Sequence, residues 1–116
     1  MADCIFCKIV AKQIPARVVH EDEHVIAFED LNPQAPTHVL VIPKKHIATM
    51  DDLAPEDEAL VGKLHRAGSA IVKARGLTGR GWRAVMNANQ DAGQTVFHIH
   101  LHVVAGRAMG WPPFPA

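Results

Sequence analysis

The stretch "TVFHIHLHVV", residues 95–104, places His98, His100 and His102 at every second position of a run that is otherwise apolar or β-branched. Strict alternation over such a run is typical of a β-strand, because successive side chains of a strand point to opposite faces of the sheet. We therefore expect the three imidazoles on one face. The apolar residues expected on the other face are Phe97, Ile99, Leu101 and Val103.

The imidazole face allows three interpretations: a metal site, a reaction centre in which imidazole attacks or transfers protons, and a merely solvated sheet face. Alternate residues of a strand lie roughly 6.6 Å apart, so three of them span about 13 Å. A tetrahedral zinc ion holds its nitrogen ligands at only about 2.0 to 2.1 Å. One ion can therefore bind two of these rings but hardly all three, which leaves at least one imidazole for chemistry.

The composition indicates a single domain over residues 1–116, because 116 residues with 48% hydrophobic content can build one core but not two. Lys plus Arg (12) balance Asp plus Glu (12) without a basic block, so we expect neither nucleic acid nor a membrane surface as a partner. Without a signal peptide or a long apolar span, we expect a cytoplasmic protein. Thiols stay reduced there, so a metal site or two buried thiols are expected at Cys4 and Cys7 rather than a disulfide.

Hydrophobic periodicity predicts a short helix within residues 4–14, ended by Pro15, and a long helix within residues 54–76. The Pro-rich tail, residues 110–116, suits neither a helix nor a central strand. The predicted strands cover residues 17–20, 24–28, 37–43, 81–87 and 95–104. Together these elements predict an α+β fold in which one long and one short helix pack on a mostly antiparallel five-stranded sheet.

The long helix has clear boundaries. Pro55 suits its first position, the acidic residues that follow complement the helix dipole, and Gly76 suits its end. Its predicted buried stripe consists of Leu60, Leu64, Ala67 and Ile71.

The segment that precedes the histidine run carries short polar groups that suit phosphate oxygens. Gly93 permits the backbone to approach a ligand closely, and neutral imidazole is a good nucleophile when its second nitrogen is held by a hydrogen bond. An ordinary polar loop between strands explains the same composition. The polar residues of this segment are Asn87, Asn89, Gln94 and Thr95.

The run from His98 to Val104 fits the His-φ-His-φ-His-φ-φ pattern, with φ apolar, and resembles the histidine triad (HIT) superfamily. Its Hint branch is also similar in "DLNPQAPTHVLVIPKKHI", in "NANQDAGQTVFHIHLHVVAGR" and in the terminal "GWPP". The resemblance implies a homodimer whose two five-stranded sheets join into one of ten strands. It also implies a purine nucleoside phosphoramidase that hydrolyses adenosine 5′-monophosphoramidate-type P–N bonds to AMP and amine.

The resemblance assigns catalytic roles by position. His100 would be the nucleophile that attacks the α-phosphorus and becomes transiently nucleotidylated, while His98 and His102 would orient it and contact the phosphate. His38 matches a fourth histidine near the reacting centre. Thr95 stands where this branch usually has Ser, near the leaving group, and its added methyl group could alter rate or leaving-group preference.

The nucleotide-binding residues follow in the same way. Asn87 matches a phosphate contact, and Asp30 matches the carboxylate that accepts from the ribose hydroxyls. Gly93 and Gln94 are further nucleotide-binding candidates, taken from the polar segment before the histidine run. Trp111 in "GWPP" would cross the dimer and border the partner's active site, unless the tail is disordered. The candidates for the base pocket are Phe6, Ile9, Phe28 and Leu31.

The resemblance also implies a structural zinc ion, with no cofactor required for catalysis. Its ligands would be Cys4, Cys7, His46 and His98, a closed Cys₂His₂ set. Two buried thiols and a surface His46 remain the alternative. Two other functions also stay open: a dinucleoside polyphosphate hydrolase, against which the "GWPP" terminus argues, and a non-catalytic nucleotide-binding regulatory protein.

Overall fold

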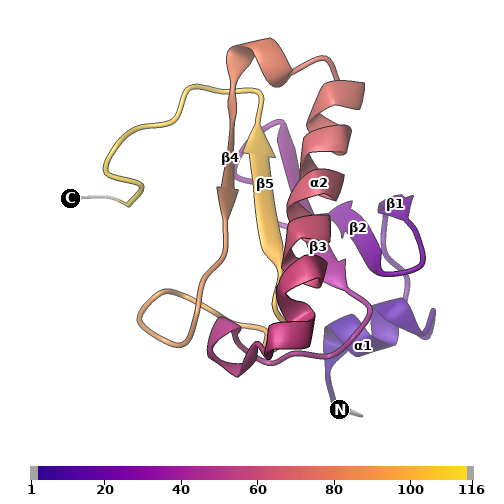
Figure 1. Cartoon of the computed structure of the whole chain (residues 1–116). Helices are drawn as coiled ribbons and strands as arrows, with labels where there is room; N and C mark the ends of the chain where they lie inside the picture. The colour runs from indigo at the N-terminus through magenta and orange to yellow at the C-terminus, as the bar shows by residue number, and fades with distance from the viewer. Residues whose placement is uncertain (1–2, 115–116) are drawn as a thin grey trace.

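The computed structural model describes residues 3–114, which form a five-stranded, wholly antiparallel sheet with one long and one short helix (Figure 1). The strand order is β1-β2-β3-β5-β4. The predicted α+β architecture is confirmed. The elements are α1 (Ile5–Val10), β1 (Val18–Glu21), β2 (Val25–Glu29), β3 (Thr37–Pro43), α2 (Glu58–Ala74), β4 (Trp82–Val85) and β5 (Leu101–Ala105).

The two helices cover opposite faces of the sheet, so that its central strands are buried on both sides. Every residue of β3 is buried, and alternate residues enter two separate apolar clusters. Val39 and Val41 pack with α2, whereas Leu40 and Ile42 pack with α1. This double burial explains why residues 39–43 of β3 are all apolar instead of alternating with polar residues.

Helix α2 packs as its periodicity predicts, although it begins later. Pro55 opens a short 3₁₀ turn, Pro55–Asp57, before the α-helix starts at Glu58. Gly76 stops the helix with φ of +71°. Leu64, Ala67 and Ile71 are buried and Leu60 is partly buried, as predicted.

Two further residues of the buried face of α2, Gly68 and Val72, are absent from the predicted stripe. A Cβ atom at Gly68 would lie 2.9 Å from Cγ2 of Val103, so glycine lets the helix approach β5 closely.

The predicted strand over residues 95–104 is wrong in its first half, because the ladder begins only at Leu101. Strand β3 ends at Pro43, which has no N–H to donate, and the Pro43 carbonyl accepts from the ring of His98 instead. Residues 94–100 therefore run without a strand partner, and Ile99 N–H donates to Ile47 O. Phe97 is 47% exposed, so its placement on the apolar face is also wrong.

The alternation of side chains nevertheless persists through this irregular segment. Ile99, Leu101 and Val103 are buried in the cluster under α2. His100 and His102 line a pocket on the opposite face. The other strands differ from prediction by one or two residues at their ends, since β1 and β2 each start one residue later and β4 is shorter.

The chain leaves the sheet after β5 and extends away from it beyond β4 (Figure 1). Trp111 and Phe114 in this tail are exposed, and the final residues 115–116 of the predicted tail lie outside the described range. No helix within residues 3–114 is long and apolar enough to cross a membrane.

Candidate active site

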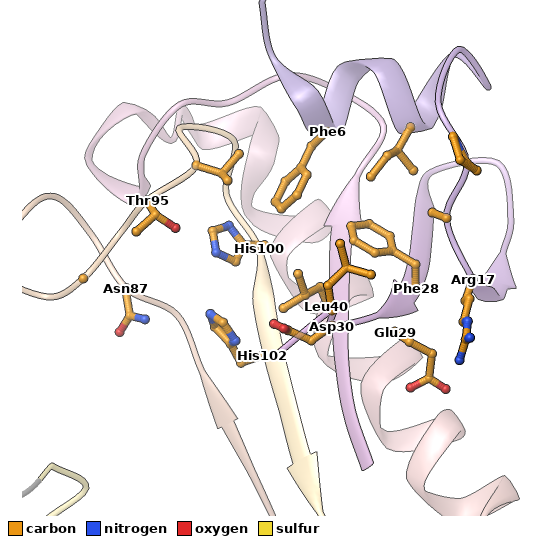
Figure 2. A pocket seen from close by; sticks show the side chains of 16 residues that line it. Phe6, Arg17, Phe28, Glu29, Asp30, Leu40, Asn87, Thr95, His100 and His102 are labelled. Carbon is orange, nitrogen blue, oxygen red and sulfur yellow. The ribbon is translucent and has the colours of Figure 1, made fainter. Parts of the chain in front are cut away.

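A pocket of about 330 Å³ opens on the face of the sheet that carries α1 (Figure 2). His100 and His102 point into it, with Thr95 and Asn87 on one side and the apolar residues Phe6, Phe28 and Leu40 on the other. The pocket thus has a polar end beside two imidazoles and an apolar end beside α1.

His100 is held in one tautomer. Its Nδ1 lies 2.9 Å from the carbonyl oxygen of His98, which can only accept, so Nδ1 carries the proton. In the neutral ring Nε2 therefore has a free lone pair. The rings of Phe6 and His100 pack in a T-shaped contact with centroids 5.2 Å apart, and the His100 side chain is buried. The arrangement presents an oriented nucleophilic nitrogen.

His102 is oriented by a chain of hydrogen bonds. Gln34 N–H donates to Nδ1 of His38 at 3.0 Å, so a neutral His38 carries its proton on Nε2. That Nε2 lies 2.9 Å from Nδ1 of His102. His102 accepts there and so keeps its own proton on Nε2. Oδ2 of Asp30, 3.4 Å from His38 Nε2, adds an acidic partner.

Burial favours the neutral form of two buried histidines, His102 and His98. It lowers the pKa of His102 to about 4, with smaller contributions from His100 and His38, while Asp30 acts in the opposite direction. The pKa of His98 is also lowered, mainly by burial. Near neutral pH, His102 therefore offers an N–H donor to a ligand without carrying a charge.

The polar end of the pocket contains most of the phosphate residues predicted from sequence. Asn87, Gly93 and Thr95 line it. Gly93 has φ of +91°, which a glycine adopts without strain. Gln94 does not line the pocket, because its amide donates to Ala48 O and Val96 O and accepts from Asn89 N–H. Its side chain shapes the loop instead.

The apolar end contains the predicted base residues. Phe6, Ile9 and Phe28 are buried and line the pocket, and Phe6 meets Phe28 edge to face with centroids 5.4 Å apart. Leu31 lines the rim but is 98% exposed. Leu40 belongs to this wall and is missing from the sequence prediction, although its position two residues after His38 on β3 could have indicated it.

The rim beyond the apolar wall is charged. Asp30 lines it and accepts from Asn32 N–H through Oδ1 at 2.7 Å. Arg17 and Glu29 also line this end, and no sequence pattern had singled them out. Trp111 does not line the pocket of its own chain and is 83% exposed.

A second cluster lies beside the pocket and shares its histidine run. One ligand atom each from Cys4, Cys7, His46 and His98 lies within 4.8 Å of the others. Nδ1 of His98 is 3.5 Å from Cys4 Sγ and 3.6 Å from Cys7 Sγ, and Nδ1 of His46 is 3.2 Å from Cys7 Sγ. We call these four residues the Cys₂His₂ cluster.

The donor set fits a zinc ion. Sulfur and nitrogen on a tetrahedral zinc would lie about 3.5 Å apart, given bonds of about 2.3 and 2.0 Å. His98 is fully buried and its Nε2–H donates to Pro43 O at 2.8 Å, which leaves Nδ1 as the ligand atom and fixes the ring. Burial, followed by the neighbouring Cys4, raises the pKa of the Cys7 thiol, an effect that a bound cation would reverse.

Comparison with known proteins agrees with this geometry. Residues 3–111 match the family model described as "Scavenger mRNA decapping enzyme C-term binding". The chain is 41% identical to a purine nucleoside phosphoramidase of Escherichia coli over 108 residues, which are 93% of this chain and 91% of that protein.

Two solved structures share the fold. A HIT family hydrolase from Legionella pneumophila is 49% identical with a TM-score of 0.94, covering 97% of this chain and 100% of that one. A zinc-bound histidine triad family protein from Mycobacterium smegmatis is 38% identical with a TM-score of 0.80, covering 91% of this chain and 76% of that one. With its three alternating histidines set around a pocket on this fold, the chain belongs to the HIT superfamily and is a HIT family hydrolase.

Proposed function

We propose that the protein is a purine nucleoside phosphoramidase, which cleaves the P–N bond of adenosine 5′-monophosphoramidate-type substrates. The observation that carries this proposal is His100, a buried imidazole whose Nδ1–H donates to a carbonyl and whose Nε2 faces the pocket. The similarity to the Escherichia coli phosphoramidase supports the same reaction.

In the first step, Nε2 of His100 attacks the α-phosphorus, and a bond from this nitrogen to phosphorus forms as the bond to the leaving amine breaks. The amine leaves with a proton, for which Nε2–H of His102 and the hydroxyl of Thr95 are the donors at this end of the pocket. In the second step, water attacks the nucleotidyl-His100 phosphorus, and one of its protons returns to the group that protonated the amine. The bond from phosphorus to Nε2 breaks, AMP is released and His100 is restored with its proton on Nδ1.

The nucleotide would lie along the pocket with its phosphate beside His100 and its base in the apolar end. Phe6, Ile9 and Phe28 supply apolar and aromatic surface for a purine. The Asp30 carboxylate at the rim would accept hydrogen bonds from the ribose hydroxyls. A volume of about 330 Å³ suits a mononucleotide.

The test is a side-by-side turnover assay with adenosine phosphoramidate, lysyl adenylate and diadenosine tetraphosphate. The His100→Ala variant should lose turnover by about a thousandfold or more and should form no labelled intermediate from an α-phosphate-tagged substrate. His65→Ala, on the exposed face of α2, is the matched control. Preference for the tetraphosphate would favour a polyphosphate hydrolase, and AMP binding without turnover would favour a regulatory protein.

We also propose that the Cys₂His₂ cluster holds a structural zinc ion, with Cys4, Cys7, His46 and His98 as ligands. Support comes from the distances within the cluster and from the zinc-bound relative of Mycobacterium smegmatis. When bound, the ion would cross-link α1 to the segments around His46 and His98. Elemental analysis of protein purified without chelator should give about one zinc per chain, and only a trace would refute the ligand set.

We further propose a homodimer in which two sheets join edge to edge. Strand β4 pairs only with β5 among the described residues and so leaves one edge for a second copy. The exposed Trp111, on the tail beyond β4, would then border the partner's pocket. Light scattering coupled to size-exclusion chromatography should give twice the chain mass of 12.6 kDa.

A further inference from the structure

The peptide unit that joins His98 to Ile99 orients the nucleophile. Its carbonyl oxygen accepts from Nδ1–H of His100 at 2.9 Å, while its N–H donates to Ile47 O at 2.8 Å. A hydrogen bond at the N–H of an amide polarises the carbonyl of the same amide and strengthens it as an acceptor. The tautomer and the direction of His100 therefore depend on where this one peptide lies.

The sheet does not hold this peptide. Strand β5 begins at Leu101, and its pairing with β3 reaches only as far as Val41 opposite Leu101. The backbone of residues 98–99 is instead held from outside the ladder, by the ring of His98 on one side and by Ile47 on the other. The position of the 98–99 peptide therefore depends on the positions of the His98 ring and of Ile47.

One of these two contacts involves a member of the Cys₂His₂ cluster, and the other involves the residue next to a member. His98 is itself a member, and Ile47 directly follows His46, another member. Cys4, Cys7 and His46 do not line the nucleotide pocket. Any effect of these three residues on the reaction is therefore indirect, and the 98–99 peptide links the cluster to the His100 imidazole by a hydrogen bond.

Without an ion, the links within the cluster are weak ones. They consist of sulfur-to-nitrogen contacts of 3.2 to 3.6 Å, and thiols are poor hydrogen-bond donors. Metal–ligand bonds would replace these contacts with shorter and directional links. Binding of an ion would therefore restrict His98 and His46 together, on both sides of the peptide.

We propose that Cys4, Cys7 and His46 are positioning residues for the hydrolysis: zinc on the cluster fixes the 98–99 peptide, which holds His100 as its Nδ1–H tautomer with Nε2 aimed at the phosphorus. The kinetic part of this inference rests on the proposed phosphoramidase function. The structural part, the state of the His100 ring, does not depend on it.

The cluster can be reached from the surface of the folded protein. Cys4 and His46 line an open hollow on the surface together with Ile5 and Phe97, both of which are exposed. We therefore expect that a chelator removes zinc, and that added zinc chloride restores it, without unfolding the chain.

The experiment compares the native protein in three states at one fixed pH and temperature: zinc-loaded, stripped with chelator, and reloaded with zinc chloride. The ¹⁵N and ¹H NMR signals of the His100 imidazole report its tautomer and the exchange of Nδ1–H with water. We expect a single Nδ1–H tautomer with slow exchange in the loaded and reloaded states. The stripped protein should show faster exchange and a mixture of tautomers.

Kinetics with adenosine phosphoramidate provide the second measurement. Stripping zinc should lower kcat about fivefold to tenfold, the size expected from one hydrogen bond, and should leave KM within about twofold. The Cys4→Ser/Cys7→Ser double variant should behave like the stripped protein and should not respond to zinc chloride. Leu64→Ala, a core change beneath α2 on the opposite face, controls for lowered stability and should keep the loaded His100 signals.

An unchanged His100 tautomer and exchange rate in the stripped protein would overturn the proposal, as would failure of the native chain to bind zinc. The proposal would also be overturned if Leu64→Ala lowered kcat by the same factor and changed the His100 signals. A general loss of stability would then explain the effect of removing zinc. If the native protein turns over no phosphoramidate while zinc still controls the His100 signals, the proposed function fails and the positioning role stands.

Discussion

The low pKa of His102 predicts a specific loss of stability in mild acid. The folded protein holds this pKa at about 4, compared with 6.5 for an unperturbed histidine. Above pH 6.5 the ring is neutral in both the folded and the unfolded state. As the pH falls from 6.5 towards 4, the unfolded chain binds a proton that the folded chain does not, so the free energy of unfolding decreases. Below pH 4 both states are protonated and the decrease levels off.

The two pKa values set the size of this effect. It amounts to about 2 kcal/mol at pH 5 and about 3 kcal/mol at pH 4, relative to neutral pH. Replacing the His102 ring with the neutral side chain of glutamine removes this pH-dependent loss of stability. The His102→Gln variant should therefore be less stable than the native protein at pH 7.5, where the bond to His38 is lost, and should recover relative to it at pH 5.

Urea unfolding of both proteins at pH 7.5, 6, 5 and 4.5, with zinc present throughout, measures this difference. His65→Gln, which changes a histidine on the exposed face of α2, is the matched control and should follow the native curve. If the native and His102→Gln curves run parallel from pH 7.5 to 4.5, the ring is not held neutral by burial and the hydrogen-bond chain through His38 is misassigned.

Three further changes have expected outcomes. Gly68→Ala should lower the free energy of unfolding by about 1 to 2 kcal/mol, because the new Cβ would lie 2.9 Å from Val103. Gly62→Ala, on the same helix, has open space around the new Cβ and should raise the free energy of unfolding by up to about 1 kcal/mol. Urea unfolding of both variants should therefore give changes of opposite sign. Asp30→Asn should weaken AMP binding about tenfold but leave 2′,3′-dideoxy-AMP unaffected in calorimetry, and equal losses for both ligands would exclude a ribose contact. Thr95→Ser should keep kcat for phosphoramidate hydrolysis within about threefold, and Thr95→Val should lower kcat about tenfold. Equal kcat values for the two variants would show that the hydroxyl has no part in the reaction.

The sequence alone was sufficient for the architecture, because its signals are local. Apolar periodicity placed α2 and its buried Leu64, Ala67 and Ile71, and residues 37–43 were predicted as a strand with the bounds that β3 has. The spacing of the histidines with the stretches around them pointed to the HIT superfamily. These patterns depend on residues close together in the chain, where spacing constrains the backbone directly.

The histidine run shows where such local reasoning ends. Uniform alternation suggested a strand over residues 95–104, but Pro43 ends the partner strand and its carbonyl binds the His98 ring, so only the second half pairs. No spacing within the run could reveal this, because the cause lies about 55 residues away. The imidazole spacing estimated from a regular strand therefore does not apply to His98.

The sequence could name the histidines of the site, but only the tertiary structure decides what each nitrogen does. The His98 carbonyl fixes the Nδ1–H tautomer at His100, whereas the Gln34 amide and the Pro43 carbonyl fix the Nε2–H tautomer at His38 and His98. Main-chain groups of this kind are the same in every residue and so leave no trace in a sequence pattern. The protonation state of an imidazole, and with it the capacity to attack phosphorus or bind a metal, follows from the neighbour that folding places against its other nitrogen.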